Sequence, residues 1–420
     1  MTANRSDPGH MLDGVRVLDL TQFLSGPFGS QMLADLGAEV IKIEPRGGDS
    51  SRAIPPHFVR GDSAYFHAVN RGKKSVQIDL KSPAGRAVFL ELVRTADVVF
   101  DNFRPGVLER LQLDHAQLER VNPKIITCSV TGFGEHGQYR DRPAYDAIVQ
   151  AMSGGMSLTG HAGAPPARMG IPIGDLSAGM YAATAIAASL VRLHRTGAGD
   201  HIEIAMLDCQ LAMLTYQAAY YLFSGAVPGP QGSGHVSIPT YRSFRCADDR
   251  YVMVTANTEA MWRSLCAAIG VAELADDPRF VDAGARLRNQ VELWVRLEPA
   301  FRELPAEEAL ARLVNAGVPA APMNTVADAL DDANTADREM LLELISAEGA
   351  VVMVSGNPIK STRGGCRGPH DHQFPPRLGG QTAEVLADLL GYEAAHIERL
   401  RRQGAVGAFE SDTPSKGLAN

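Results

Sequence analysis

Apolar and polar positions follow two alternating patterns along the first half of the chain. Short runs of apolar residues are typical of strands buried on both faces of a sheet, and they alternate with segments in which apolar residues recur every three or four positions. The pattern predicts strands at Val15–Leu20, Val40–Ile43, Ser75–Leu80, Val98–Phe100, Lys124–Val130 and Ile202–Met206. Strands that alternate with helices at this spacing predict an α/β fold, a parallel sheet with flanking helices.

The helices between these strands have recognisable ends. Gly37 would end the first helix because glycine fits the left-handed position after a helix, and Ser82 with Pro83 would begin another. One long helix is rich in alanine, glycine and serine, which permits close packing against a second backbone. The expected helices include Phe28–Leu36, Ser177–His194 and Cys209–Phe223.

The composition changes after residue 224. Gly225–Pro239 is rich in glycine and proline and indicates a loop or linker. A strand at Tyr251–Ala256 and helices at Met261–Ile269 and Leu293–Leu304 follow, typical of a smaller α+β domain. We therefore expect a Rossmann-like large domain over residues 12–224 and a smaller domain over 225–325. The chain would return to the large domain over 326–406, through a helix that Thr382 caps and Gly391 ends, and finish in a disordered tail over 407–420.

Composition and charge exclude several classes of protein. The 420 residues are 45% apolar and 21% charged, the balance of a globular protein with a full core, and the net charge of -8 argues against a dedicated nucleic-acid binder. The N-terminus lacks a signal-peptide core, and the most apolar stretch, Ala178–Val191, is too short to cross a bilayer. Five scattered cysteines indicate free thiols in a reducing compartment. We expect a cytoplasmic protein with no membrane or nucleic-acid partner.

Familiar cofactor and metal motifs are absent from the sequence. There is no GxxxxGK[ST] loop and no HExxH, and the turn after the first strand is TQFLSGP in place of GxGxxG. His370 and His372 form an HxH pair in a polar loop, but a zinc site needs a third ligand. We predict no metal site.

The segment Met169–Gly179 contains the strongest candidate for chemistry. A strand-like apolar run ends at Gly174-Asp175, and a helix follows directly. Asp175 fits a helix N-cap, for which aspartate is favoured. It also fits a nucleophile, because a helix N-terminus stabilises an ionised carboxylate. The residues by themselves leave both interpretations open.

A series of short motifs resembles the class III CoA-transferases. This family includes formyl-CoA transferase and carnitine CoA-transferases and is related to the α-methylacyl-CoA racemases. The similarity extends from about Leu12 to Val406, and the order and spacing of the motifs argue against a chance match. The motifs are GVRVLDL with the following SGP, LGAEVIKIEPRGGD, KKSVQIDLKSPAGR, DVVFDNFRPGVLERLQL, NPKIITCSVTGFG, RPAYDAIVQAMSG, GIPIGDLSAG, DPRF, AGVPAAPMNT and PPRLGGQTAEVLADLLG.

The resemblance implies that Asp175 is a nucleophile. It would attack an acyl-CoA thioester and form a mixed anhydride, and returning CoA would give an aspartyl-CoA thioester that a free carboxylic acid attacks. Binding makes the first attack intramolecular, which compensates for a weak nucleophile. Backbone N–H groups near Gly174 or in a glycine loop would stabilise the oxyanion. Coenzyme A or acyl-CoA is then a substrate, and no cofactor is bound permanently.

The residues before Asp175 distinguish transferase from racemase. By resemblance, racemases use a histidine at the position that matches Ala144 or Tyr145 here, and transferases have tyrosine. Neither residue readily moves a proton near neutral pH. The sequence therefore favours a CoA-transferase, with an α-methylacyl-CoA racemase as the alternative.

The resemblance also implies a binding site for the phosphate-bearing CoA, where an acidic protein must gather cations locally. Arg46 is one phosphate candidate, with Pro45 as the alternative alignment of the family's arginine. The adenosine site would comprise Ile78, Asp79, Leu80 and Lys81. The phosphate and pantetheine site would comprise Asn102, Phe103, Arg104 and Arg110. Arg142 and Tyr145 complete the predicted CoA-binding residues.

Three substrate residues follow from the same resemblance. Leu24 takes the position of a glutamine in formyl-CoA transferase, so an apolar wall indicates an acyl group bulkier than formyl or oxalate. Gly234 and His235 belong to Gly232-Ser233-Gly234-His235, which corresponds to a glycine-rich lid or forms part of the interdomain linker. His235 and Ser237 would meet a second carboxylate, which points to dicarboxylic acids such as succinate.

The family forms interlocked homodimers, so the resemblance implies self-association. The long connections at residues 225–239 and 321–342 fit two chains threaded through each other. The expected partners are therefore acyl-CoA, a small carboxylic acid and a second copy of the chain.

Overall fold

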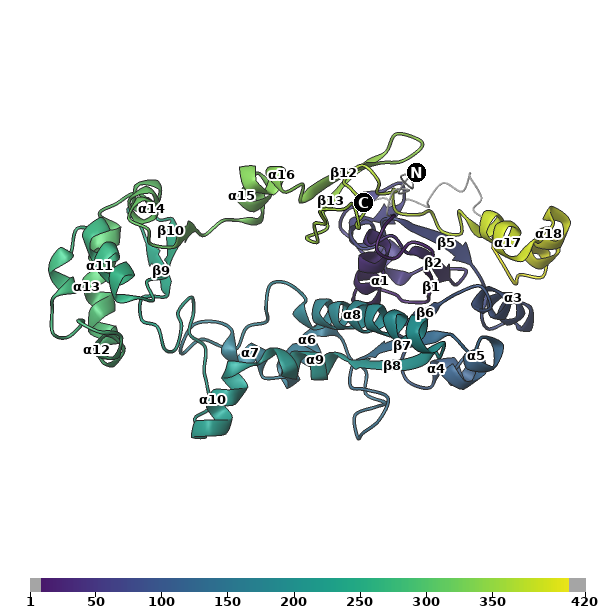
Figure 1. The fold of residues 1–420 in the computed structure, drawn as a ribbon, viewed down its shortest axis with the longest axis horizontal. Helices are drawn as coiled ribbons and strands as arrows, with labels where there is room; N and C mark the ends of the chain where they lie inside the picture. The colour runs from purple at the N-terminus through teal and green to yellow at the C-terminus, as the bar shows by residue number, and fades with distance from the viewer. Residues whose placement is uncertain (1–8, 408–420) are drawn as a thin grey trace, which may run out of the picture. The chain divides into compact units, whose positions relative to one another are not determined.

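The computed structural model describes residues 9–407, which form two compact units (Figure 1). The larger unit comprises residues 9–155, Arg168–Ala219 and 334–407, and the smaller comprises Met156–Ala167 and Tyr220–Ala333. Met156–Ala167 was expected in the large domain. It joins the smaller unit instead, and its contacts there include a hydrogen bond from the Gly232 N–H to the Gly160 carbonyl (2.8 Å).

The larger unit is built on a six-stranded sheet. Its strands are β1 (Arg16–Asp19), β2 (Glu39–Glu44), β5 (Lys73–Gln77), β6 (Val98–Asp101), β7 (Ile126–Thr131) and β8 (Asp200–Ala205). Their order is β5-β2-β1-β6-β7-β8, and every pairing is parallel. The predicted α/β fold is confirmed. The strand order reverses between β1 and β6, so the carboxyl ends of these two strands form the crevice in which doubly wound sheets bind ligands.

Alternate strand residues face two apolar cores, and helices cover both faces of the sheet (Figure 1). Leu18, Ile41 and Val76 pack in one core, and Val17, Val40 and Phe100 pack in the other. The first core includes α3 (Pro83–Val93), α5 (His115–Val121), α17 (Thr382–Leu390) and α18 (Ala394–Arg402). The second includes α1 (Ser25–Asp35), α6 (Asp146–Met152), α8 (Ile173–Thr196) and α9 (Met206–Met213).

Two glycines let α1 and α8 pack backbone against backbone. A Cβ at Gly29 would lie 2.8 Å from the Gly179 carbonyl oxygen, and a Cβ at Gly179 would lie 2.5 Å from the Ser25 carbonyl oxygen. The close packing expected of this small-residue helix is confirmed. Because Asp175 lies one turn before Gly179, this contact also fixes Asp175 beside the start of α1.

Helix α8 is longer than its sequence pattern suggested. It has 24 residues and an apolar window of mean hydropathy 1.4, which is long and apolar enough to cross a membrane by length and composition alone. Its residues Ala178, Ala182 and Ile186 are fully buried in the second core, while 39% of the apolar window as a whole is buried, and a single helix of this kind is weak evidence for a membrane span.

Most helix ends agree with the sequence signals, with two corrections. Ser82 caps α3 through the Gly85 N–H (3.0 Å), and Gly37 and Gly391 have positive φ as predicted. Thr382 is the first residue of α17 and not its cap. The single helix expected at Cys209–Phe223 is two helices, α9 and α10 (Tyr216–Ser224), because Thr215 between them has a left-handed φ of 44°.

The smaller unit has the expected α+β character. Its antiparallel sheet has the order β11 (Ala320–Pro322), β10 (Tyr251–Val254), β9 (Arg242–Arg245). Helices α11 (Glu259–Ala268), α12 (Ala283–Arg288), α13 (Gln290–Arg302) and α14 (Ala306–Asn315) enclose a core around Trp262. Phe244 of β9 stacks on Phe301 of α13 with ring centroids 4.3 Å apart. The sheet and helices are therefore one packed body.

Short elements complete the chain. In the larger unit they are the 3-10 turn η1 (Ser50–Ala53), β3 (Phe58–Val59), β4 (Asp62–Ser63), α2 (Ala64–Ala68), α4 (Val107–Arg110), β12 (Leu341–Ile345) and β13 (Val351–Ser355). The others are α7 (Gly155–Leu158), η2 (Ala272–Ala275), α15 (Val326–Leu330) and α16 (Ala333–Asp337). The tail predicted over residues 407–420 lies outside the described residues from residue 408. Gly407 is ordered, and its N–H donates to the Gln77 carbonyl (3.0 Å).

Candidate active site

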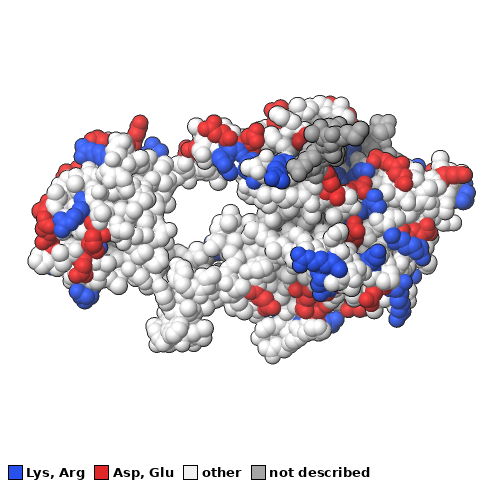
Figure 2. Space-filling model, viewed as in Figure 1, with Lys and Arg blue, Asp and Glu red and all other residues white. Residues whose placement is uncertain are grey.

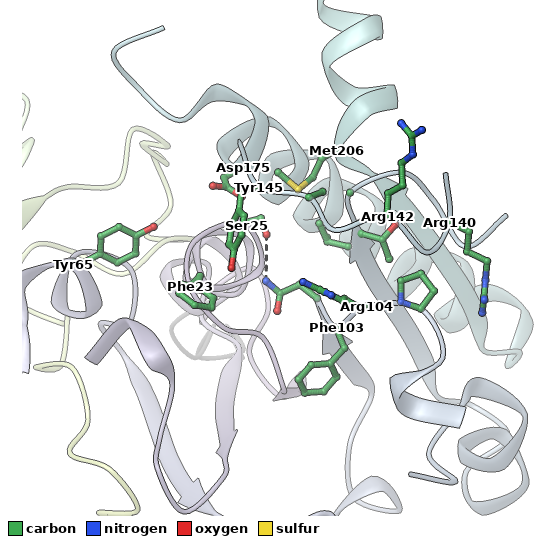
Figure 3. Close-up of a pocket in the computed structure, with 16 residues that line it drawn as sticks. Phe23, Ser25, Tyr65, Phe103, Arg104, Arg140, Arg142, Tyr145, Asp175 and Met206 are labelled. Carbon is green, nitrogen blue, oxygen red and sulfur yellow. Dashed lines mark hydrogen bonds between the residues drawn. The ribbon is translucent and has the colours of Figure 1, made fainter. Parts of the chain in front are cut away.

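A cavity that we call the Asp175 cavity opens at the carboxyl ends of four sheet strands (Figure 3). Each of β1, β6, β7 and β8 contributes residues from its carboxyl end or the segment after it, so the cavity occupies the crevice that the strand order defines. The lining residues are Phe23, Ser25, Tyr65, Asn102, Phe103, Arg104, Pro105, Val130, Thr131, Gly132, Arg140, Arg142, Ala144, Tyr145, Asp175 and Met206.

Asp175 lies in the first turn of α8, although no strand precedes it and Pro172 takes the N-cap position. Burial raises the pKa of Asp175, and the negative charge of Asp146 raises it further, to about 7. Near neutral pH the carboxyl group therefore populates both its protonated form and its ionised, nucleophilic form. A pKa this far from normal in a cavity is typical of a functional site.

Asp146 is held beside Asp175 by two hydrogen bonds. Its Oδ1 accepts from the Gly174 N–H (2.8 Å), and its Oδ2 accepts from Gln150 Nε2 (2.8 Å). Backbone N–H groups near Gly174 or in a glycine loop were expected to stabilise an oxyanion. The Gly174 N–H itself already donates to Asp146, so an oxyanion needs a different donor.

Tyr65 is such a donor, and its hydroxyl points toward Asp175 from α2 (Figure 3). Burial raises the pKa of Tyr65 to about 12, with smaller contributions from nearby carboxylates led by Asp175. The side chain is therefore a neutral phenol near pH 7 and can donate a hydrogen bond. Ser63 fixes the turn by accepting from the Tyr65 N–H (3.1 Å).

Phe23 takes the place that was expected for Leu24. Phe23 lines the cavity and contacts Tyr145 edge to face, with centroids 6.5 Å apart, whereas Leu24 precedes α1 and is not among the lining residues. The backbone of Phe23 has a left-handed φ of 63°, which turns the chain before α1. An apolar side chain does border the cavity, but one residue earlier than predicted.

A buried ion pair supports this turn. The Phe23 N–H donates to Asp49 Oδ1 (3.2 Å), and Asp49 Oδ2 lies 2.9 Å from Lys42 Nζ, with both charged side chains fully buried. Lys42 also donates to the Thr21 carbonyl (2.6 Å). The residues before α1 are therefore tied to β2 and to the segment that follows it.

Asn102 lines the cavity, but its side-chain amide forms hydrogen bonds with the turn before α1. Its Nδ2 donates to the Gln22 carbonyl (2.8 Å) and to Ser25 Oγ (3.3 Å, Figure 3), and its Oδ1 accepts from the Gln22 N–H (2.8 Å). These contacts join the loops after β1 and β6 across the switch point. Asn102 therefore positions the cavity wall.

Arg104, Arg140 and Arg142 provide positive charge along the cavity that holds Asp175. The Arg142 guanidinium stacks over the Tyr139 ring at 4.0 Å, and Arg140 Nε donates to the Glu135 carbonyl (2.8 Å). The ends of Arg140 and Arg142 are directed away from Asp175 (Figure 3), so the three arginines give the cavity wall a positive charge that suits an anionic substrate without pairing with the Asp175 carboxyl group.

A second cavity, the Arg46 cavity, shares Phe103 with the Asp175 cavity. It brings together five residues predicted for CoA, and Pro45 as well: Arg46, Ile78, Asp79, Leu80 and Lys81. Arg46 donates to the Gly404 carbonyl (2.9 Å), so the returning C-terminal segment positions it. Arg110 is exposed at the end of α4 and lines neither cavity, in contrast to its prediction.

The remaining predicted substrate residues belong to the smaller unit. Gly234 lines a cavity within that unit, whereas His235 is not among its lining residues. The His235 ring stacks on Tyr241 at 5.6 Å, and its Nδ1 accepts from the Ser237 N–H (3.1 Å). Across residues 9–407 no group of three metal-ligating side chains occurs, and His372 lies 3.4 Å from Asp35.

Comparison with known proteins identifies the family. Residues 12–382 match the model of CoA-transferase family III. The chain belongs to CoA-transferase family III. It is 41% identical over 389 residues to the acetyl-CoA:oxalate CoA-transferase of Acetobacter aceti, which covers 92% of this chain and 98% of that protein. It is 39% identical over 394 residues to the succinate–glutarate CoA-transferase of Agrobacterium fabrum, which covers 92% and 96%.

A solved structure agrees with the family assignment. The crystal structure of a CaiB/BaiF family protein from Brucella suis matches with a TM-score of 0.80 at 37% identity, covering 91% of this chain and 100% of that one. The resemblance drawn from the motifs is confirmed, and this member of CoA-transferase family III is an enzyme, a CoA-transferase.

Proposed function

We propose that this CoA-transferase moves CoA from an acyl-CoA to a free dicarboxylic acid, with Asp175 as the nucleophile. The observation that carries the proposal is a carboxyl group with a pKa of about 7 beside a neutral phenol, in a cavity whose wall includes three arginines. The dicarboxylic class rests on similarity to enzymes named for oxalate and for succinate and glutarate.

CoA would occupy both cavities. Arg46 and Lys81 would meet its phosphate-bearing end in the Arg46 cavity, and the pantetheine arm would pass Phe103 toward Asp175. The shared residue Phe103 supports this path, because one flexible arm can then link the two cavities.

The reaction would proceed through covalent intermediates on Asp175. The ionised carboxylate attacks the thioester carbonyl carbon, the carbon–sulfur bond breaks, and CoA thiolate leaves behind an acyl-aspartyl anhydride. The thiolate then attacks the Asp175 carbonyl carbon and releases the donor acid as its carboxylate. The acceptor carboxylate attacks the resulting aspartyl-CoA thioester, and returning thiolate takes the new acyl group and regenerates Asp175.

Each attack on a carbonyl group develops negative charge on oxygen. The Tyr65 hydroxyl is directed into the cavity beside Asp175 and would donate a hydrogen bond to that oxygen (Figure 3). Because the phenol keeps its proton near neutral pH, this donor is in place before the reaction starts.

The residues around Asp175 support a transferase over the racemase alternative. Ala144 and Tyr145 both line the cavity, so either alignment of the racemase histidine falls within it. Among the described residues that line the Asp175 cavity there is no histidine to exchange a proton at an α-carbon.

Self-association is part of the proposal. Helix α10 has no charged residue, and its surface is uncharged in Figure 2. Two of its apolar side chains, Leu222 and Phe223, are 79% and 93% exposed. An apolar surface of this kind is typical of an interface. Light scattering should give twice the mass of one chain, and the mass of a single chain would contradict the homodimer.

The test is an exchange assay read by mass spectrometry. Purified enzyme is incubated with succinyl-CoA or acetyl-CoA and a panel of monocarboxylic and dicarboxylic acids, and we expect new thioesters with the dicarboxylic acids. Asp175→Asn should abolish exchange, and Asp388→Asn, at an exposed position of α17, should leave it unchanged. Full activity in Asp175→Asn would overturn the nucleophile, and exchange with monocarboxylic acids alone would overturn the substrate class.

A further inference from the structure

The smaller unit has a cavity of about 320 Å³ that the proposed mechanism does not use. We call it the Arg242 cavity. It lies among the loop that contains Ser233, strand β9 and helix α13, and all of its lining residues belong to the smaller unit. Its charged lining residues are Arg242, Arg245, Arg302 and Glu298. Three arginines against one glutamate make a positive site in a chain whose net charge is -8.

Arg242 is the most enclosed of these arginines. Its side chain is 22% exposed, and its guanidinium lies 4.3 Å from the Trp294 ring centroid and 5.4 Å from that of Phe244. Glu298 Oε1 lies 3.1 Å from Arg242 Nη2, but the Glu298 side chain is 53% exposed. Burial lowers the pKa of Arg242, and Glu298 only partly offsets that effect. The cation is therefore incompletely compensated within the protein.

The other two arginines share one carboxylate. Arg245 and Arg302 lie 2.5 Å and 3.5 Å from Asp249 Oδ1, and the Asp249 side chain is 67% exposed and does not line the cavity. Asp249 offsets one of these two positive charges, so Arg245 and Arg302 together leave one net positive charge near Arg242.

Neutral hydrogen-bonding groups complete the wall. Ser233 Oγ lies 2.6 Å from Ser243 Oγ, and the Ser243 N–H donates to Ser233 Oγ (3.1 Å). His161 approaches the loop where Gly232 has a φ of 61°, and a Cβ there would lie 2.7 Å from His161 Nδ1. Gly232 therefore lets His161 reach the cavity. The wall combines cations, hydroxyl groups and an imidazole, which are groups that hold small organic anions.

We propose that the Arg242 cavity is a binding site for a small organic anion and that Arg242 recognises a carboxylate group of that anion. The planar guanidinium can hold both carboxylate oxygens at once, and Trp294 and Phe244 keep it in place. The identity of the anion rests on the proposed function, while the existence of the site does not.

The experiment measures binding without turnover. Glutarate and acetate are titrated into the full-length enzyme in the absence of acyl-CoA, followed by ligand-observed NMR, and CoA is titrated separately. We compare wild type with Arg242→Met, Arg242→Lys and the control Arg263→Met, in which an exposed arginine of α11 outside the cavity is lost. Thermal unfolding confirms that each variant is folded, and Arg242→Lys keeps a cation if Arg242→Met is unstable.

The expected result is a dissociation constant for glutarate that rises about 10- to 100-fold in Arg242→Met, less in Arg242→Lys and not at all in Arg263→Met. CoA binding should not change. Unchanged glutarate binding in folded Arg242→Met would overturn the proposal, as would a loss of CoA binding without a loss of glutarate binding. If glutarate binds through Arg242 but the wild type exchanges no acid, the proposed function fails and this site stands. If instead the wild type exchanges dicarboxylic acids and glutarate binding is unchanged in folded Arg242→Met, the proposed function stands and this site is overturned.

Discussion

Two regions of the larger unit shift the pKa of a buried aspartate in opposite directions. Beside the turn that joins β1 to α1, burial by itself would raise the pKa of Asp49. The positive charge of Lys42 and the hydrogen bond from Lys42 outweigh burial, so the pKa of Asp49 is lowered. In the Asp175 cavity, burial raises the pKa of Asp175, and its charged neighbour is another carboxylate. The first aspartate is a structural anion, and the second keeps a pKa near neutral, which the nucleophile of the proposed mechanism requires.

Loss of the structural anion should have the largest effect on stability. Asp49→Asn leaves Lys42 charged in a fully buried site, so the free energy of unfolding should fall by about 3 kcal/mol. Denaturant unfolding measures this change. Glu39→Gln, which breaks the partly exposed pair with Arg16, should cost less than about 1 kcal/mol. Equal losses in the two variants would contradict the difference between these regions.

Loss of the phenol should slow the chemical step without unfolding the site. Tyr65→Phe removes one hydrogen-bond donor beside Asp175, and kcat for exchange should fall about 100-fold with a smaller change in KM. Steady-state kinetics on the donor acyl-CoA test this, with Tyr181→Phe on the exposed face of α8 as the control. A change in KM alone would assign Tyr65 to binding.

Loss of the reactive carboxyl group should stabilise the fold. The folded pKa of Asp175, about 7, exceeds its normal value of 3.8, so its ionised form opposes folding as the pH rises from about 4 to 7. Asp175→Asn should therefore raise the free energy of unfolding by about 2 kcal/mol at about pH 8, but not at about pH 4. Unfolding at the two pH values checks the sign, and equal effects at both would show that ionisation is not the cause.

The smallest effect concerns the neighbour that helps set this pKa. Asp146→Asn removes a negative charge near Asp175, so the acid limb of the pH dependence of kcat/KM should move down by about one pH unit or less. The amide keeps an oxygen that can accept from the Gly174 N–H, so the start of α8 should stay in place. An acid limb that stays at about pH 7 would assign the shift to burial alone.

Much of the fold could be predicted from apolar patterning, because strands buried on both faces leave clear apolar runs. All six strands of the parallel sheet were anticipated, and the small residues of α8 correctly indicated close packing. Contacts distant in sequence could not be anticipated. The break at Thr215 depends on a local φ, and the assignment of Met156–Ala167 to the smaller unit depends on contacts with residues more than 60 positions later, such as Gly160 with Gly232.

The residues of the candidate site could likewise be predicted only in part. Motifs located Asp175 and the residues of the Arg46 cavity, because these residues lie in continuous sequence segments. Tyr65 and Phe23 were missed. Tyr65 lies in a segment without a recognised motif, and the left-handed turn at Phe23 shifts the cavity-facing residue by one position. A left-handed φ at a phenylalanine cannot be predicted from the sequence, because this conformation is usual only for glycine.

The most direct test of the account is to trap the covalent intermediate. The enzyme is mixed with donor acyl-CoA in the absence of acceptor, quenched with hydroxylamine, digested and examined by mass spectrometry. The account predicts a hydroxamate on Asp175, formed from the aspartyl-CoA thioester or the anhydride, and none in Asp175→Asn. A modified residue other than Asp175, or unmodified Asp175 in an enzyme that still exchanges CoA, would contradict it.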